Sequence, residues 1–251
     1  MNTPDAKPSP PPDSAGQAAA SGFRDAVALP ALIVLTGMMG FGSLAADSGI
    51  SLWGSLAASA GIWGLPGQVA MAEFYAAGAG ALAVAVAVSL ANARFMPMTM
   101  SLFPLMRGGF KNRLHPYALV QLISVNSWAA CNNAFPSIPH NHRVHYYTTF
   151  ALTILVIGQA GTALGYFAVA ALPRAVTLGL IFLNPCYFAL LFAGTRVRAN
   201  AVALVLGAVA GPPVFALIPE WSLLITGLAA GTAAFVIAPS VSRPGSDGRA
   251  P

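Results

Sequence analysis

Residues 26–46 read AVALPALIVLTGMMGFGSLAA, an uninterrupted run without a charged side chain that is closed by Asp47, Ser48 and Gly49. A helix of about 20 apolar residues crosses the hydrocarbon core of a bilayer. The run therefore predicts a transmembrane helix, and it indicates that the remainder of the chain belongs to a membrane protein.

The composition of the whole chain agrees with this interpretation. Of the 251 residues, 57% are hydrophobic and only 8% are charged, whereas about 25% of a soluble domain is charged. So few charges cannot cover a water-facing surface, and lipid must contact much of it. The net charge of +5 comes from basic residues at segment ends, which suits a membrane face and argues against nucleic-acid binding. Cys131 and Cys186 lie in or beside apolar runs, where cysteines act as small hydrophobic residues.

Five further runs are apolar enough to cross the membrane: residues 74–91, 146–172, 175–193, 199–218 and 221–238. The predicted fold class is all-α, a polytopic membrane helix bundle with about six to eight membrane segments, two of them broken or re-entrant. Trp53, Tyr146 and Tyr147 near segment ends are expected to be interface anchors.

The two segments predicted to be broken are residues 51–71 and 116–135. The first contains four glycines and Pro66 and leads into Gln68, and the second contains Gln121 and three asparagines before Pro136. Irregular backbone at membrane depth is tolerated only where protein buries it or where it lines a wet cavity. Interrupted segments of this kind are the best sequence indication of a transporter's binding site.

The termini differ from the apolar middle of the chain. Residues 1–22 form a Pro/Ala-rich segment and residues 240–251 a polar one, and both are predicted to be disordered tails because they cannot bury enough apolar surface. Residues 23–239 are the predicted transmembrane transporter domain. The basic loop with Arg94, Arg107, Lys111 and Arg113 is expected in the cytoplasm. This favours six clean spans plus two broken segments, and seven or eight spans is the alternative.

The stretch of residues 64–108, GLPGQVAMAEFYAAGAGALAVAVAVSLANARFMPMTMSLFPLMRG, resembles the AzlC/YgaZ family, the large subunits of bacterial exporters for branched-chain amino acids. The family pattern has a small-residue turn ending in Gln, an apolar helix closing on Asn-x-Arg, and a short segment ending in Pro. Gln68, Asn92, Arg94 and Pro104 match it at the expected spacing.

The resemblance extends over residues 22–237. Gly22-Phe23-Arg24 precedes the first span, residues 161–165 (GTALG) resemble the family's G-T-x-x-G turn, and Asn184-Pro185 opens a stretch similar to its L-P-x-x-F-x-A-L-L motif. Phe95 stands where the family usually has His, and residues 125–127 (VNS) stand where it has an acidic T-D-E stretch. Both departures remove polar or titratable groups from pathway positions.

The resemblance implies a multi-pass protein of the bacterial inner membrane that works with a small AzlD-like membrane subunit and uses no cofactor. An exported amino acid is a zwitterion, and a broken helix end and a guanidinium are suitable partners for its carboxylate. The candidate substrate-binding residues are Gln68, Asn92, Arg94, Glu73 and Asn184. For each there is a structural alternative: helix packing for Gln68, a cap for Asn92, snorkelling for Arg94, an interfacial position for Glu73, and a kink at Asn184-Pro185.

Two classes of function remain open on the sequence alone. The first is a secondary transporter that exports small hydrophobic amino acids, driven by an ion or substrate gradient because the chain carries no nucleotide-binding motif. The second is a membrane protein of other function: a transporter of an unrelated solute, an intramembrane enzyme or an assembly factor. An enzyme would need a convergent set of catalytic side chains within the spans, and the sequence shows none. The histidines of HNHRVH, residues 140–145, are expected to lie in a loop without metal.

Overall fold

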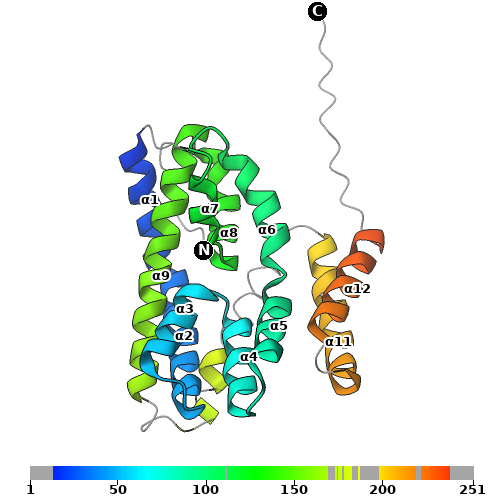
Figure 1. Cartoon of the computed structure of the whole chain (residues 1–251). Coiled ribbons are helices and arrows are strands. Elements are labelled where there is room, and N and C mark those ends of the chain that lie inside the picture. Colours follow the sequence, from blue (N-terminus) through cyan, green and yellow to red (C-terminus); the bar gives the residue numbers. More distant parts are fainter. Residues whose placement is uncertain are drawn as a thin grey trace, which may run out of the picture. The chain divides into compact units, whose positions relative to one another are not determined.

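The computed structural model describes residues 14–110, 112–168, 173, 175–176, 178–182, 186, 198–218 and 222–237. Every regular element among these residues is a helix, which confirms the predicted all-α class. The chain divides into two compact units, Met1–Asn184 and Pro185–Pro251 (Figure 1).

Two long helices form the core of the first unit. Helix α2 (Leu29–Asp47) and helix α9 (Arg143–Ala168) pack along each other, and both are long and apolar enough to cross a membrane. They confirm the spans predicted from residues 26–46 and, as far as Ala168, from 146–172.

Small residues allow the backbones of α2 and α9 to approach closely. A Cβ added to Gly161 would lie 2.6 Å from the carbonyl oxygen of Leu35, and one added to Gly165 would overlap the backbone of Met39. Membrane helices associate through such small-residue faces because lipid offers no hydrophobic driving force between them. Residues 161–165 therefore lie inside α9 as a packing face, and the turn expected there is wrong.

Helix α1 (Ala15–Val27) packs on α9, beside which it lies in Figure 1. Ala18, Gly22 and Ala26, spaced four apart, form its buried face, and the backbones approach closely because these residues are small. The predicted disordered tail is therefore wrong for residues 15–22, since its Ala/Gly-rich composition serves helix packing. Residues 1–13 and 240–251 lie outside the described residues.

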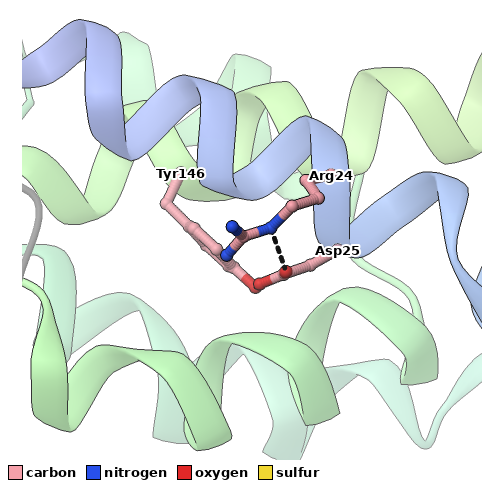
Figure 2. A network of polar contacts seen from close by, with 3 residues as sticks. All are labelled: Arg24, Asp25 and Tyr146. Atoms are coloured by element: carbon pink, nitrogen blue, oxygen red, sulfur yellow. Dashed lines mark hydrogen bonds and ion pairs between the residues drawn. The ribbon is translucent and has the colours of Figure 1, made fainter. Parts of the chain in front are cut away.

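A polar contact joins α1 to the start of α9. The hydroxyl of Tyr146 donates to Asp25 Oδ2 at 2.8 Å, and Arg24 Nε lies 3.7 Å from Asp25 Oδ1 (Figure 2). Tyr146 and Tyr147 are buried, with 1% and 0% of their surface exposed. The expectation that these two tyrosines are interface anchors is wrong, because α1 and neighbouring segments cover them.

The segment predicted to be broken at residues 51–71 consists of α3 (Leu52–Gly61) and the start of α4 (Leu65–Ala76). The predicted clean span 74–91 is also interrupted, because α4 ends at Ala76 and α5 (Ala81–Asn92) begins only at Ala81. Gly78 between them has φ +72°, a conformation that costs glycine little. This break is a correction to the sequence analysis.

A third and a fourth break follow. Helix α5 and the segment Phe95–Met106, which holds α6 (Phe95–Leu102) and the 3₁₀ turn η1 (Phe103–Met106), meet at an angle of 43° and can together count as one bent span. Helices α7 (His115–Val120) and α8 (Val125–Ala134) divide residues 116–135, as predicted. Two 3₁₀ turns, η2 (Phe135–Ser137) and η3 (His140–His142), lead into α9.

The second unit holds α11 (Arg198–Leu217), which contains Pro212 and Pro213, packed against α12 (Ser222–Ile237). Most of the predicted span 175–193 lies outside the described residues. Within the described part of the chain, two helices satisfy the length and hydropathy of a span, or three if the bent pair is one span. The predicted number of six to eight segments therefore remains a prediction.

Candidate substrate site at three helix breaks

The break between α3 and α4 is the centre of the candidate site. Trp63 lies in it with φ +44° and only 4% of its surface exposed. Helix α4 then begins at Leu65-Pro66, after an N-cap, Gly64, that has no side chain to cap it. Pro66 suits a first helical turn, where its missing N–H group is not needed. The chain therefore ends one helix and starts another within three residues.

The carbonyl groups of a helix's last turn lack partners within the helix, and three carboxamide side chains donate to carbonyls at the end of α3. Ala60 and Gly61 are exposed there, and Ala58 O also accepts the Ile62 N–H group at 2.9 Å. Gln68 Nε2 donates to Ala58 O at 3.5 Å, and Asn92 Nδ2 donates to Ile62 O at 3.1 Å. Gln121 Nε2 donates to both Ala60 O at 2.9 Å and Gly61 O at 2.7 Å. These three side chains, here called the carboxamide set, come from α4, α5 and the end of α7. They join three broken segments through one helix terminus.

Asn92 also lies against the first turn of α4. A Cβ added to Gly64 would lie 2.5 Å from Asn92 Oδ1, and one added to Gly67 would lie 2.8 Å from the same atom. Glycine at both positions therefore gives Asn92 access to the helix terminus. Any larger residue at either position would displace this side chain.

A pocket of about 430 Å³ lies among three segments that are each next to a helix break: α3–α4, α5–α6 and α7–α8. Its lining comes from the α3–α4 break, from α6 and from the α7–α8 break: Ile62, Trp63, Phe95, Met96, Thr99, Met100, Val120, Gln121 and Ile123. The lining is mostly apolar, and the Thr99 hydroxyl is engaged with Phe95 O at 2.8 Å. Such a pocket, apolar with a few polar groups, is typical of small-molecule sites.

Four buried polar atoms of this region have no hydrogen-bond partner. Trp63 Nε1 and Arg94 Nε are donors, and Gln68 Oε1 and Asn92 Oδ1 are acceptors. The Arg94 guanidinium also stacks on Phe95, with its Cζ 5.2 Å from the ring centroid. Leaving a buried polar atom unpaired costs about 1–3 kcal/mol, so four of them in one region point to a bound ligand or water.

The sequence-predicted residues divide into three groups. Gln68 and Asn92 meet at the end of α3, and Arg94 begins the adjoining helix with a buried Nε. Glu73 lies on an exposed part of α4, whereas Gln68 on the same helix is fully buried. Asn184 lies outside the described residues.

Sequence reasoning missed two contributors to the site. Gln121 was one of several amides in a broken segment, and only its contact with α3 distinguishes it. Trp63 is an aromatic residue between apolar neighbours, and nothing local indicates its positive φ. Gln159, by contrast, links two helices, because its Nε2 on α9 donates to Leu56 O of α3 at 3.3 Å.

The HNHRVH stretch has a structural role centred on Arg143. Its guanidinium donates to Ile138 O at 3.0 Å, Leu105 O at 3.1 Å and Phe135 O at 2.8 Å. These contacts hold the turns before α9. In the part of the chain that the structure describes, no group of three or more His, Cys, Asp or Glu side chains is arranged to hold a metal ion.

Long apolar helices, together with broken segments whose backbone is satisfied by protein groups, define a helical membrane protein. The family model described as AzlC protein matches residues 30–172, and the chain belongs to this family. The match includes every residue of the pocket and of the carboxamide set. The family is associated with transport and not with catalysis. No curated protein and no solved structure gives a significant match to the chain.

Proposed function

We propose that this protein is a secondary transporter of the bacterial inner membrane that exports branched-chain or other small hydrophobic amino acids together with a small AzlD-like subunit. The observation that carries the proposal is the apolar pocket at the helix breaks together with two donors and two acceptors that are buried without partners. Trp63 lines the pocket, and Arg94 and Asn92 contact the lining residues Phe95 and Ile62. Membership of the AzlC family supports transport as the general activity.

The unpaired atoms match the two charged ends of an amino acid. In the proposal, the substrate carboxylate accepts hydrogen bonds from Arg94 Nε and Trp63 Nε1, since donors from an ionised group and an indole suit an anion. The substrate ammonium donates to Gln68 Oε1 and Asn92 Oδ1. Each contact would give a partner to a polar atom that is buried without one.

The side chain of the substrate occupies the apolar pocket in this proposal. Ile62, Met96, Met100 and Ile123 are among the residues that would surround it. Burying apolar surface contributes about 25 cal/mol per Å², and methionines adapt to side chains of different shape. This composition favours aliphatic amino acids over polar ones.

The helix breaks supply the conformational change that transport requires. Discontinuous helices at membrane depth carry binding sites in transporters and let one part of a bundle move against another. Here the carboxamide set holds three such segments on the end of α3. Substrate binding at the adjacent unpaired atoms would change which of these hydrogen bonds are made. Glu73, which is exposed on α4, has no part in this scheme, and Asn184 lies outside the described residues.

The proposal is tested by efflux. Cells loaded with dipeptides, with and without this protein and its small partner, are compared for release of valine, leucine, isoleucine and methionine. Faster release with the protein is expected, and equal release of all four would contradict the proposed substrate class. Release of a different solute would favour the alternative of an unrelated transporter.

Two variants locate the site in the same assay. Gln68→Ala and Arg94→Ala are expected to reduce efflux at unchanged protein level. Gln159→Ala is the matched control, because Gln159 also donates from its carboxamide to α3 but, unlike Gln68 and Arg94, has no atom among the buried polar atoms without a partner. Normal efflux by both site variants would show that the substrate binds elsewhere.

A further inference from the structure

Trp63 is held in an unusual backbone conformation. Of the residues that the structure describes, it is the one non-glycine residue with positive φ, at +44°. For a bulky residue this conformation is an outlier that costs about 1–3 kcal/mol and persists only where the surroundings impose it. The contacts of the indole ring show what imposes it.

Trp63 meets helix α9 through its indole ring and is also a lining residue of the pocket. A Cβ added to Gly158 of α9 would lie 3.0 Å from Trp63 Cζ3 and 3.1 Å from Cη2, with Met38 Cγ at 3.5 Å. Only 4% of the Trp63 surface is exposed. The absence of a side chain at Gly158 therefore gives the ring its room.

We infer that Gly158 and Trp63 together set the depth of the substrate pocket, and so the size of the side chain that the protein prefers. This inference rests on the proposed function. Trp63 is the specificity-determining wall, and Gly158 is a positioning residue that acts through it. Gly158 lies on one of the two long helices, and α9 also packs against α2. The rigid core thereby determines the shape of the site.

The change needed to alter the pocket is small. A methyl group at position 158 would meet the ring at a distance tighter than ordinary contact, so the ring must move by a few tenths of an ångström. Protein interiors are close-packed, and a displaced wall removes volume from the cavity on its other side. One methylene in an apolar pocket changes discrimination about 10- to 200-fold, so a partial displacement is expected to change it by about fivefold.

The experiment measures substrate selectivity of the purified protein with its small subunit in liposomes. Initial rates for valine, leucine, methionine and phenylalanine give kcat/KM for each substrate, and their ratios do not depend on the amount of active protein. Gly158→Ala is expected to lower the leucine-to-valine ratio about fivefold. Trp63→Phe is expected to raise the phenylalanine-to-leucine ratio, since a smaller ring enlarges the pocket. The double variant is expected to return toward the wild-type ratios.

Gly161→Ala is the matched control. It introduces the same methyl group on the same helix, but the atoms nearest to the new Cβ would be Leu35 O and Met38 Cβ, whereas at Gly158 they belong to the indole ring. It is expected to lower the yield of folded protein without changing any ratio. A change of ratio in Gly161→Ala equal to that in Gly158→Ala would overturn the inference, because general loosening of the bundle would then explain both.

The remaining outcomes are also decisive. Wild-type ratios in an active Gly158→Ala protein would overturn the inference and leave the proposed function intact. If Gly158→Ala does not fold, unchanged ratios in Trp63→Phe would overturn it instead. If the wild-type protein moves none of the four amino acids, the proposed function fails and the inference fails with it.

Discussion

The pair formed by α2 and α9 differs from the broken segments α3 to α8 in which groups make hydrogen bonds with the backbone. Within α2 and α9 each helix makes its own hydrogen bonds, and small residues bring the two backbones together. In the broken segments the backbone depends on side chains from elsewhere, as at the end of α3. A bundle that only had to be stable would need just the first arrangement. The second arrangement leaves buried polar atoms without partners, and these form the proposed substrate site.

The comparison predicts that the largest effect on stability comes from the α2–α9 contact. Gly165→Ala places a methyl group against the backbone of Met39, and overpacking of this kind costs about 3 kcal/mol. A lower midpoint of thermal unfolding in detergent is the measurement. Gly61→Ala is the control, because a Cβ there meets nothing within 4 Å, and it is expected to unfold near the wild-type temperature. Equal midpoints for both variants would remove the distinction between the two regions.

A second prediction concerns Asn92, whose effect should fall on activity and much less on stability. Asn92→Ala removes the bond to Ile62 O and the unpaired Oδ1, and a hydrogen bond to a charged group contributes about 1.5–3 kcal/mol. Efflux of leucine is expected to fall about tenfold or more. If Asn92→Ala instead unfolds as Gly165→Ala does while its remaining efflux per folded molecule is normal, Asn92 is only a structural cap.

A third prediction tests how Gln121 holds the broken segments together. Gln121→Ala removes the donors to Ala60 O and Gly61 O, with a loss of about 1–2 kcal/mol. Backbone amides around residues 61–65 are expected to exchange hydrogen faster, while those of α9 stay protected. Unchanged exchange at the α3–α4 break would mean that other contacts hold it closed.

The polar contact between α1 and α9 is expected to make a smaller contribution to stability. Tyr146→Phe removes the donor to Asp25 Oδ2 (Figure 2). The expected cost is about 1 kcal/mol, since the carboxylate is partly exposed. Limited proteolysis near residue 25 is the measurement, with faster cleavage expected. Asp25→Ala, which removes the acceptor, should behave similarly. Cleavage at the wild-type rate would show that apolar packing alone holds α1.

The smallest effect is expected at Glu73, which the sequence singled out as an acid within an apolar stretch. Its exposure on α4 places it away from the buried Gln68. Glu73→Gln is expected to export leucine at a rate within about twofold of wild type, because an exposed charge makes little net contribution. A large loss of leucine export, or a changed dependence of export on the proton gradient, would show that Glu73 takes part in transport.

Sequence reasoning succeeded where the signal was local. The apolar runs predicted α2 and α9, and the glycines and amides of residues 51–71 and 116–135 predicted two of the breaks. It failed where a local pattern was compatible with two structures. The run of residues 74–91 is apolar throughout, yet Gly78 divides it. The Ala/Gly-rich segment of residues 15–22 looked unstructured, yet its small residues pack on α9.

The sequence by itself determined that this is an all-α membrane protein with interrupted segments, and it indicated Gln68 and Asn92, because hydropathy and helix-breaking residues act over short distances. Only the tertiary structure decided that Gln121 and Trp63 join them, and that Gly158 supports Trp63. The physical reason is that the carbonyl groups at the end of α3 take whichever donors the packing brings to them. Those donors come from residues 10, 30 and 61 positions away along the chain.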